Sequence, residues 1–127
     1  MDFALTEEQQ MIFDMAYQFG QSEIAPHARQ WEADGTIPRQ VLQAAAELGF
    51  AAMYVPEDMG GTGLSRLDAT LVFEALSMAC PAVASFLSIH NMCAKMVASH
   101  ASDAAHTRYL PGLISMDIVA SYCLTEP

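Results

Sequence analysis

Apolar residues near the start of the chain recur at the spacing of one helix face. Ile12, Met15 and Phe19 stand three and four positions apart, which places their side chains on the same side of an α-helix. The preceding stretch 6–9, Thr-Glu-Glu-Gln, matches a capping box, in which the threonine and glutamine side chains each bond a backbone N–H of the first turn. The pattern predicts a helix that begins after residue 6 and ends or kinks at Pro26.

Helix caps and helix breakers divide the rest of the chain into further helices. Gly35 and Gly49 are stop signals, Pro81 suits the first turn of a helix, and Ser65 and Ser102 are N-cap residues. The predicted helices span residues 26–34, 39–48, 66–79, 81–100 and 104–115, the last interrupted by Pro111-Gly112. The predicted fold class is all-α, an antiparallel bundle of about six helices.

The helix predicted over residues 81–100 carries apolar side chains nearly all the way round. A helix that is apolar on every side is expected to be buried on every side. The residues that give this pattern are Val83, Phe86, Leu87, Ile89, Met92, Cys93, Met96 and Val97.

Two apolar runs lack helical spacing. The run 50–55 predicts a short buried strand or extended segment, and the glycine-containing stretch 56–63 that follows predicts a loop. The run 118–125 mixes apolar and β-branched residues and predicts a strand. Because a single strand in a helical chain has no sheet to join, we expect residues 118–125 to be disordered or to pair with another copy.

The charge and cysteine content exclude several classes of function. Fifteen acidic residues against five basic ones give a net charge of -10, which argues against a nucleic-acid partner and against a grip on phosphate groups. Three cysteines without close pairing favour a reduced intracellular protein. The N-terminus resembles no leader and no apolar run is long enough to span a membrane, so we expect a cytoplasmic protein without membrane contact.

Three features suggest chemistry, and each has a plainer structural interpretation. The stretch 60–63, Gly-Gly-Thr-Gly, lacks the lysine of a phosphate loop and predicts a structural turn. His90 and Cys93 are three positions apart on a helix of core residues, without the further ligands that zinc requires, so we predict no metal site. We expect His90 to bond Asn91 or a backbone carbonyl, and Cys123 to be a small buried hydrophobe without a base nearby.

The last six residues resemble the opening of the acyl-CoA dehydrogenase signature. They read Tyr-Cys-Leu-Thr-Glu-Pro, and the segment 55–64, Val-Pro-Glu-Asp-Met-Gly-Gly-Thr-Gly-Leu, is similar to a second recurrent segment of that family. Residues 63–68, 73–76 and 88–94 look most like its isobutyryl-CoA branch. The resemblance implies that residues 1–117 are the N-terminal helical domain and that residues 118–127 begin a flavin-binding middle β-domain.

The resemblance also implies an activity and a set of site residues. Family members use FAD to oxidise an acyl-CoA to the 2-enoyl-CoA, pass electrons to an electron-transfer flavoprotein and are usually homotetramers. Ser88 and Met92 match positions that line the end of the acyl pocket, and Tyr122, Leu124 and Thr125 match positions that border the flavin ring. The catalytic glutamate of the family lies in a C-terminal domain, so no residue here is assigned a catalytic role.

Two alternatives remain open from the residues. The chain is either part of such an enzyme or a free-standing helical interaction module with the same sequence pattern. Within the enzymes, an acyl-CoA dehydrogenase or oxidase for another chain length fits as well, because one methylene is worth only about 1 to 3 kcal/mol of discrimination. A flavin-domain sequence encoded after residue 127 would separate the enzyme from the module.

Overall fold

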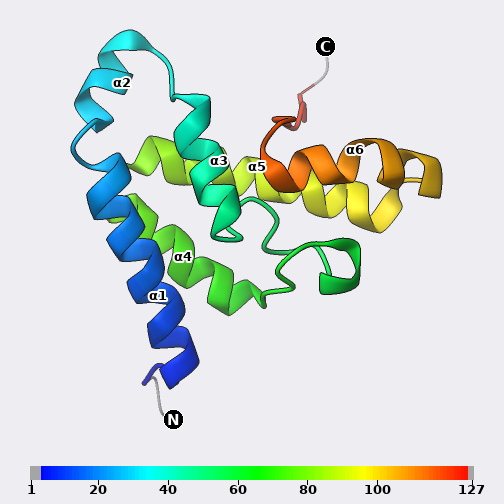
Figure 1. Ribbon diagram of the computed structural model, residues 1–127, viewed down its shortest axis with the longest axis horizontal. Helices are drawn as coiled ribbons and strands as arrows, with labels where there is room; N and C mark the ends of the chain where they lie inside the picture. The colour runs from blue at the N-terminus through cyan, green and yellow to red at the C-terminus, as the bar shows by residue number, and fades with distance from the viewer. Residues whose placement is uncertain (1–3, 126–127) are drawn as a thin grey trace.

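The computed structural model describes residues 4–125, and helices form most of that part of the chain (Figure 1). No strand occurs among these residues, so the predicted all-α fold class is confirmed. None of the helices in the described range has the length and apolar content that crossing a membrane requires. The elements in chain order are α1 (Glu7–Phe19), a π-helical turn (Gly20–Ile24), α2 (Ala28–Asp34), α3 (Arg39–Glu47), a 3-10 turn (Glu57–Met59), α4 (Arg66–Ala79), α5 (Pro81–His100) and α6 (Asp103–Ser115).

Helix α1 begins with the predicted capping box and packs along α4. The Gln9 amide donates to the Thr6 hydroxyl at 3.1 Å, and the Thr6 amide donates to the Gln9 side-chain oxygen at 3.1 Å. The same glutamine donates to the Asp68 carboxylate at 3.1 Å and so joins the two helices. Near Gly20, where α1 passes into the π-helical turn, an added Cβ would lie 3.1 Å from the Ala79 Cβ. The helical backbone continues through this turn to Ile24 and ends just before Pro26, as predicted.

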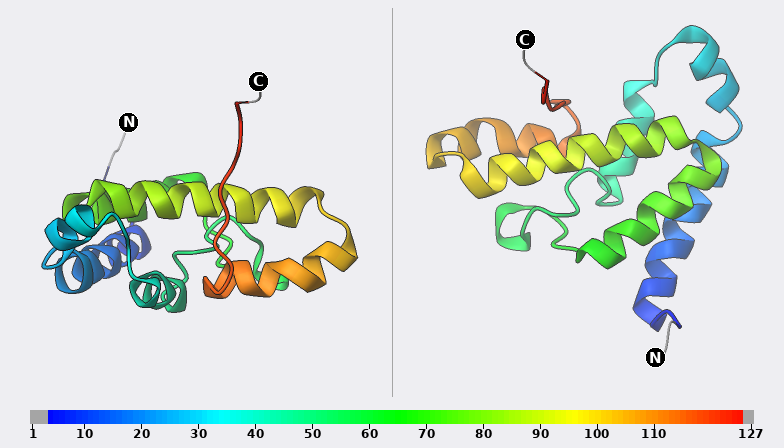
Figure 2. Two further views of the ribbon diagram at one scale, coloured as in Figure 1. Left: turned by 90° about the horizontal axis from the view of Figure 1, so that it is seen from above. Right: turned by 180° about the vertical axis from the view of Figure 1, so that it is seen from behind.

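Helix α5 is the longest element and contacts the rest of the fold along its whole length. In Figures 1 and 2 it runs beside α4 near its start, and α6 returns antiparallel to it near its end. One buried cluster joins the start of α5 to α1, α3 and α4 and includes Phe19, Leu42 and Leu76. A second cluster joins the end of α5 to α6 and includes Leu110 and Leu113.

The apolar run 50–55 is buried, as predicted, but it forms turns instead of a strand. Asn91 of α5 is fully buried beside it, receives the Met53 amide at 2.7 Å and donates to the Phe50 carbonyl at 2.7 Å. On its other side, the Leu64 amide donates to the Met53 carbonyl at 2.7 Å. The strand prediction was wrong because side-chain and loop hydrogen bonds satisfy this backbone, so no ladder is needed.

Helix α6 continues through Pro111, where the sequence predicts an interruption. Proline has a fixed φ near the helical value, but inside a helix it removes one backbone hydrogen bond and its ring crowds the carbonyl four residues earlier. Leu110 and Leu113, on either side of it, are both buried in the second cluster. Their packing holds the helix together across the proline.

The run 118–125 forms no strand in the described part of the chain, which corrects the sequence prediction. The Ile118 amide donates to the Gly112 carbonyl at 2.9 Å, and the Ala120 amide donates to His90 Nδ1 at 3.2 Å. Figure 2 shows this segment leaving the end of α6, crossing α5 and continuing away from the helices. The described residues offer it no strand to pair with. Glu126 and Pro127, which complete the signature resemblance, lie outside the described residues.

Candidate functional site

Helix α5 has one exposed apolar face, which corrects the prediction that it is buried all round. Ile89, Met92 and Met96 are 43%, 39% and 39% exposed, and their spacing of three and four residues places them on one side. Leu87 and Ala94 on the opposite side are fully buried. The apolar pattern of the sequence is the same on both sides, and only the packing of the neighbouring helices distinguishes them.

The two predicted substrate residues lie on this face. Ser88 is half-buried and Met92 is exposed, one helical turn further on. The Ser88 hydroxyl donates to the Ser85 carbonyl at 3.0 Å, so its proton is used within the helix and its oxygen remains an acceptor. The face as a whole is apolar with small residues at one end, a suitable wall for a hydrocarbon chain. Sequence reasoning did not single out Ile89 and Met96, because only the packing of the neighbouring helices shows which side of α5 stays exposed.

The three predicted cofactor residues lie on the segment that crosses α5. Tyr122 is 43% exposed and Leu124 is 75% exposed, and Thr125 is exposed too. Burial, and then the nearby Cys123 thiol, raise the pKa of the Cys93 thiol on α5. The Ala120 amide, just before this stretch, donates to His90 Nδ1 at 3.2 Å, which brings the segment to the helix that carries Ser88 and Met92. Cys123 itself is exposed, contrary to the prediction that it is buried.

His90 is fully buried and joins α5 to both α6 and the crossing segment. Its Nε2 lies 2.8 Å from the Leu113 carbonyl oxygen, which confirms the predicted bond to a backbone carbonyl, and its Nδ1 lies 3.2 Å from the Ala120 amide nitrogen. Burial lowers the pKa of His90, although the bond to the Leu113 carbonyl acts in the opposite direction. With both ring nitrogens engaged, this imidazole has no free lone pair for a metal ion.

The Gly60–Gly63 loop is a structural turn, as predicted. Its Gly61, Thr62 and Gly63 amides donate inward to the carbonyls of Pro56, Ala52 and Val55 at 2.9 to 3.1 Å. An anion would need these same N–H groups to point outward. Within this loop an added Cβ on Gly61 would lie 2.1 Å from the Val55 carbonyl oxygen, so the close approach of two backbone segments requires glycine.

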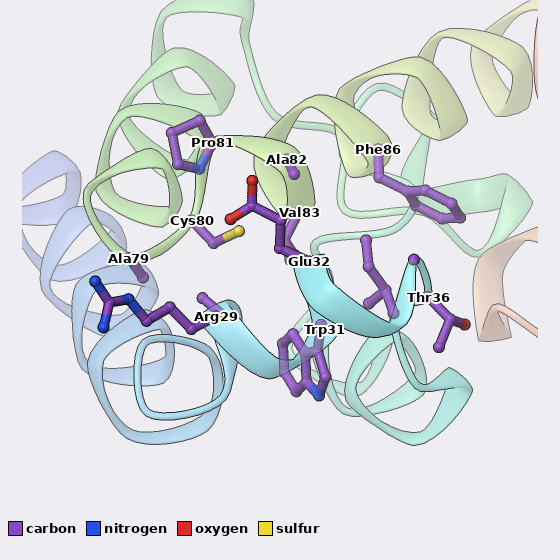
Figure 3. Close-up of a pocket in the computed structure, with 13 residues that line it drawn as sticks. Arg29, Trp31, Glu32, Thr36, Ala79, Cys80, Pro81, Ala82, Val83 and Phe86 are labelled. Carbon is purple, nitrogen blue, oxygen red and sulfur yellow. The ribbon is translucent and has the colours of Figure 1, made fainter.

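A cleft of about 760 Å³ lies elsewhere, beside the start of α5 (Figure 3). Figure 3 shows α2 on one side, with Arg29, Trp31 and Glu32, and the junction of α4 and α5 on the other, with Cys80 and Phe86. Its lining is mainly apolar and its charged groups are one arginine and one glutamate. It contains none of the predicted site residues, which lie further along α5 and after α6.

Several known proteins are similar to this chain in sequence and in fold. Residues 6–117 match the family described as acyl-CoA dehydrogenase, N-terminal domain. Isobutyryl-CoA dehydrogenase of Dictyostelium discoideum, named as mitochondrial, is 47% identical over 123 residues, which cover 97% of this chain and 30% of the relative. Glutaryl-coenzyme A dehydrogenase, solved with glutaryl-CoA, has a TM-score of 0.90 and 30% identity over 100% of this chain and 33% of its own.

A third protein, PigA, has been solved in complex with FAD. It has a TM-score of 0.85 and 26% identity over 94% of this chain and 32% of its own. This chain therefore spans about a third of the length of the proteins it resembles. The family match covers nearly all of α1 to α6, and the identity to the Dictyostelium enzyme extends over almost the whole chain. The chain belongs to the acyl-CoA dehydrogenase family, and its residues 6–117 are the N-terminal domain of that family.

Proposed function

We propose that this chain is the N-terminal domain of a flavin-dependent acyl-CoA dehydrogenase that oxidises a short or branched acyl-CoA to the 2-enoyl-CoA. The observation that carries the proposal is the exposed apolar face of α5, which bears Ile89, Met92 and Met96 beside the segment after α6. An exposed apolar stripe on the longest helix of the described residues is a surface meant to be covered. The isobutyryl-CoA relative at 47% identity supports a short branched acyl group as the substrate.

On the substrate side, Ser88 and Met92 form part of the wall of the acyl pocket. The thioether of Met92 is flexible and polarizable, so it adapts to the end of an apolar chain. Ser88 is small and leaves room one helical turn away, while its hydroxyl proton stays bound to the Ser85 carbonyl. Together the two side chains set how much hydrocarbon fits against this part of α5.

On the cofactor side, Tyr122, Leu124 and Thr125 border the flavin ring of FAD. Two of these exposed residues carry hydroxyl groups, which can donate to the polar edge of the ring and tune its electronics. FAD, when bound, accepts the β-hydrogen of the acyl group as hydride while a glutamate outside these residues takes the α-proton. With a net charge of -10, this chain is unsuited to hold the pyrophosphate, which other parts of the enzyme bind.

The family resemblance supports further partners. We expect an electron-transfer flavoprotein as electron acceptor, a homotetramer in the whole enzyme, and no catalytic residue within this domain. The cytoplasmic location stays a prediction, and the Dictyostelium relative carries a mitochondrial name. Fractionation of cells that make the native protein would decide between the two compartments.

The test is a hybrid enzyme in which residues 6–125 of this chain replace the matching segment of the Dictyostelium relative. The hybrid should bind FAD and oxidise isobutyryl-CoA. Ser88→Phe should shift its preference toward shorter acyl chains, because overpacking a closed pocket costs about 1 to 3 kcal/mol. Met92→Ala should shift the preference toward longer chains. Rates with a series of acyl-CoA substrates measure both effects.

The matched controls lie next to each other on α4. Ser77 and Met78 are both exposed and lie on a different helix from Ser88 and Met92. Ser77→Phe and Met78→Ala should therefore leave the chain-length preference unchanged. A hybrid that folds without FAD binding, or a preference that responds no more to the α5 pair than to the α4 pair, would contradict the proposed function.

A further inference from the structure

We propose that His90 is a positioning residue, whose neutral imidazole ties the segment after α6 to α5 and so sets the place of Tyr122, Leu124 and Thr125. The proposal rests on the proposed function for what these three residues contact. The tie itself is a property of this chain alone. His90 is fully buried and, among the residues of α5, it is the one whose side chain bonds both the last turn of α6 and the segment after it.

The chemistry of the two partners determines the protonation of the ring. A backbone amide can only donate, so His90 Nδ1 must be the acceptor for the Ala120 N–H at 3.2 Å. A backbone carbonyl can only accept, so Nε2 must carry the proton that it donates to the Leu113 oxygen at 2.8 Å. Only the neutral tautomer with the proton on Nε2 makes both bonds, and a proton on Nδ1 would face the Ala120 N–H.

The segment is anchored in steps, and His90 provides the last one. Immediately after α6, Arg39 of α3 donates to the Met116 and Asp117 carbonyls at 3.1 and 2.8 Å. The Ile118 amide then donates to the Gly112 carbonyl at 2.9 Å. Beyond Ala120, no hydrogen bond occurs in the described part of the segment, whose residues 121–125 are all exposed. The bond to His90 is therefore the point from which the three predicted flavin contacts extend.

Two substitutions divide the roles of the imidazole between them. His90→Gln places an amide donor near the position of Nε2 and keeps the bond to Leu113, but it removes the acceptor for Ala120. His90→Asn places an amide oxygen near the position of Nδ1 and keeps the acceptor for Ala120, but it does not reach Leu113. If His90 acts only by packing, the two substitutions should have similar effects on hydrogen exchange at the Ala120 amide. If His90 ties the segment to α5, His90→Gln should speed this exchange and His90→Asn should leave the amide protected.

The experiment is hydrogen exchange at single amides of this chain, which needs no flavin. The Ala120 amide should be protected in the parent and in His90→Asn, and should exchange about tenfold faster in His90→Gln, as expected for one lost hydrogen bond. The Met53 amide, which Asn91 holds at 2.7 Å, should stay protected in all three and reports that the fold is intact. Nitrogen NMR of the parent should find His90 Nε2 protonated and His90 Nδ1 unprotonated.

Two results with this chain alone would overturn the proposal: equal exchange at Ala120 in the parent and in His90→Gln, or a protonated Nδ1 in the parent. The nitrogen measurement decides even if a variant does not fold. In the hybrid enzyme, His90→Gln should weaken FAD binding and His90→Asn should restore it. If exchange follows the prediction while the hybrid binds no FAD, the tie stands and the proposed function fails. If the hybrid binds FAD equally in both variants, the positioning role fails.

Discussion

The two apolar runs of the chain, residues 50–55 and 118–125, have similar composition and opposite environments. Both predict extended structure, and neither forms a strand in the described residues. The first is buried and is bonded from two sides, by Asn91 and by the loop 62–64. The second leaves the fold, with His90 as its outermost bond and Leu124 largely exposed.

The difference shows that an apolar run acquires its structure from the partners that its backbone finds. Asn91 supplies one acceptor and two donors to the first run and to its own helix, so that run needs no sheet. His90 supplies a single acceptor to the second run, and the surface that would cover the rest of it is not part of the described residues. The buried run 50–55 is held by Asn91 and the exposed run 118–125 by His90, and these two residues of α5 are adjacent in sequence.

The largest expected effect comes from removing the anchor of the buried run. Asn91→Leu keeps the size of the side chain but leaves the Met53 amide and the Phe50 carbonyl buried without partners. We expect a loss of about 3 kcal/mol or more in the free energy of unfolding. Urea unfolding followed by circular dichroism measures it. The control is Gln10→Leu on the exposed side of α1, which should change the free energy of unfolding by less than about 0.5 kcal/mol. Similar losses in both variants would contradict the role of Asn91 as the anchor of the buried run.

The next effect tests the close approach between the buried run and its loop. In Gly61→Ala the new Cβ would lie 2.1 Å from the Val55 carbonyl oxygen, so the backbone must shift. We expect a loss of about 2 kcal/mol, in the range of overpacked cores. Gly35→Ala is the comparison, because no atom lies within 4 Å of its Cβ and its cost comes only from a positive φ of 66°. A thermal melt in which Gly35→Ala is the less stable variant would count against the loop packing.

Local signals account for what the sequence predicted correctly. The capping box at Thr6, the N-cap at Ser65 and the stop at Gly35 act within one turn of the chain, and the structure confirms all three. The exposed face of α5 could not be predicted, because the side that stays open depends on where α4 and α6 pack. The His90 bonds join residues 23 and 30 positions apart, and no local pattern encodes such a pairing.

A smaller effect depends on pH and comes from the anchor of the exposed run. Burial lowers the pKa of His90 in the fold below the ordinary value of 6.5. The unfolded chain therefore takes up a proton first as the pH falls, and stability is lost from pH 6.5 down to the folded pKa, at no more than about 1.4 kcal/mol per pH unit. The Cys93 thiol nearby stays neutral in this range, because burial and then Cys123 raise its pKa.

Denaturant midpoints between pH 7.5 and pH 5 measure this dependence. His90→Asn does not titrate in that range and should reduce the slope while it keeps the bond to Ala120. A slope that is the same in the parent and in this variant would assign the pH dependence to other groups.

The smallest expected effect compares one apolar side chain from each run. Leu124 is 75% exposed, so Leu124→Ser removes little buried area and should change the unfolding free energy of this chain by less than about 0.5 kcal/mol. Val55 is fully buried, and Val55→Ser should cost about 2 kcal/mol or more, because it leaves a cavity and buries a hydroxyl. Chemical denaturation of the two variants gives both values. A loss at Leu124 as large as that at Val55 would mean that the crossing segment is packed within this domain in solution, and the contrast between the two runs would disappear. The other outcome is that Leu124→Ser leaves the unfolding free energy of this chain nearly unchanged and weakens FAD binding in the hybrid enzyme. That pair of results would mean that the Leu124 side chain makes its contact outside the domain and contributes nothing to the stability of the domain.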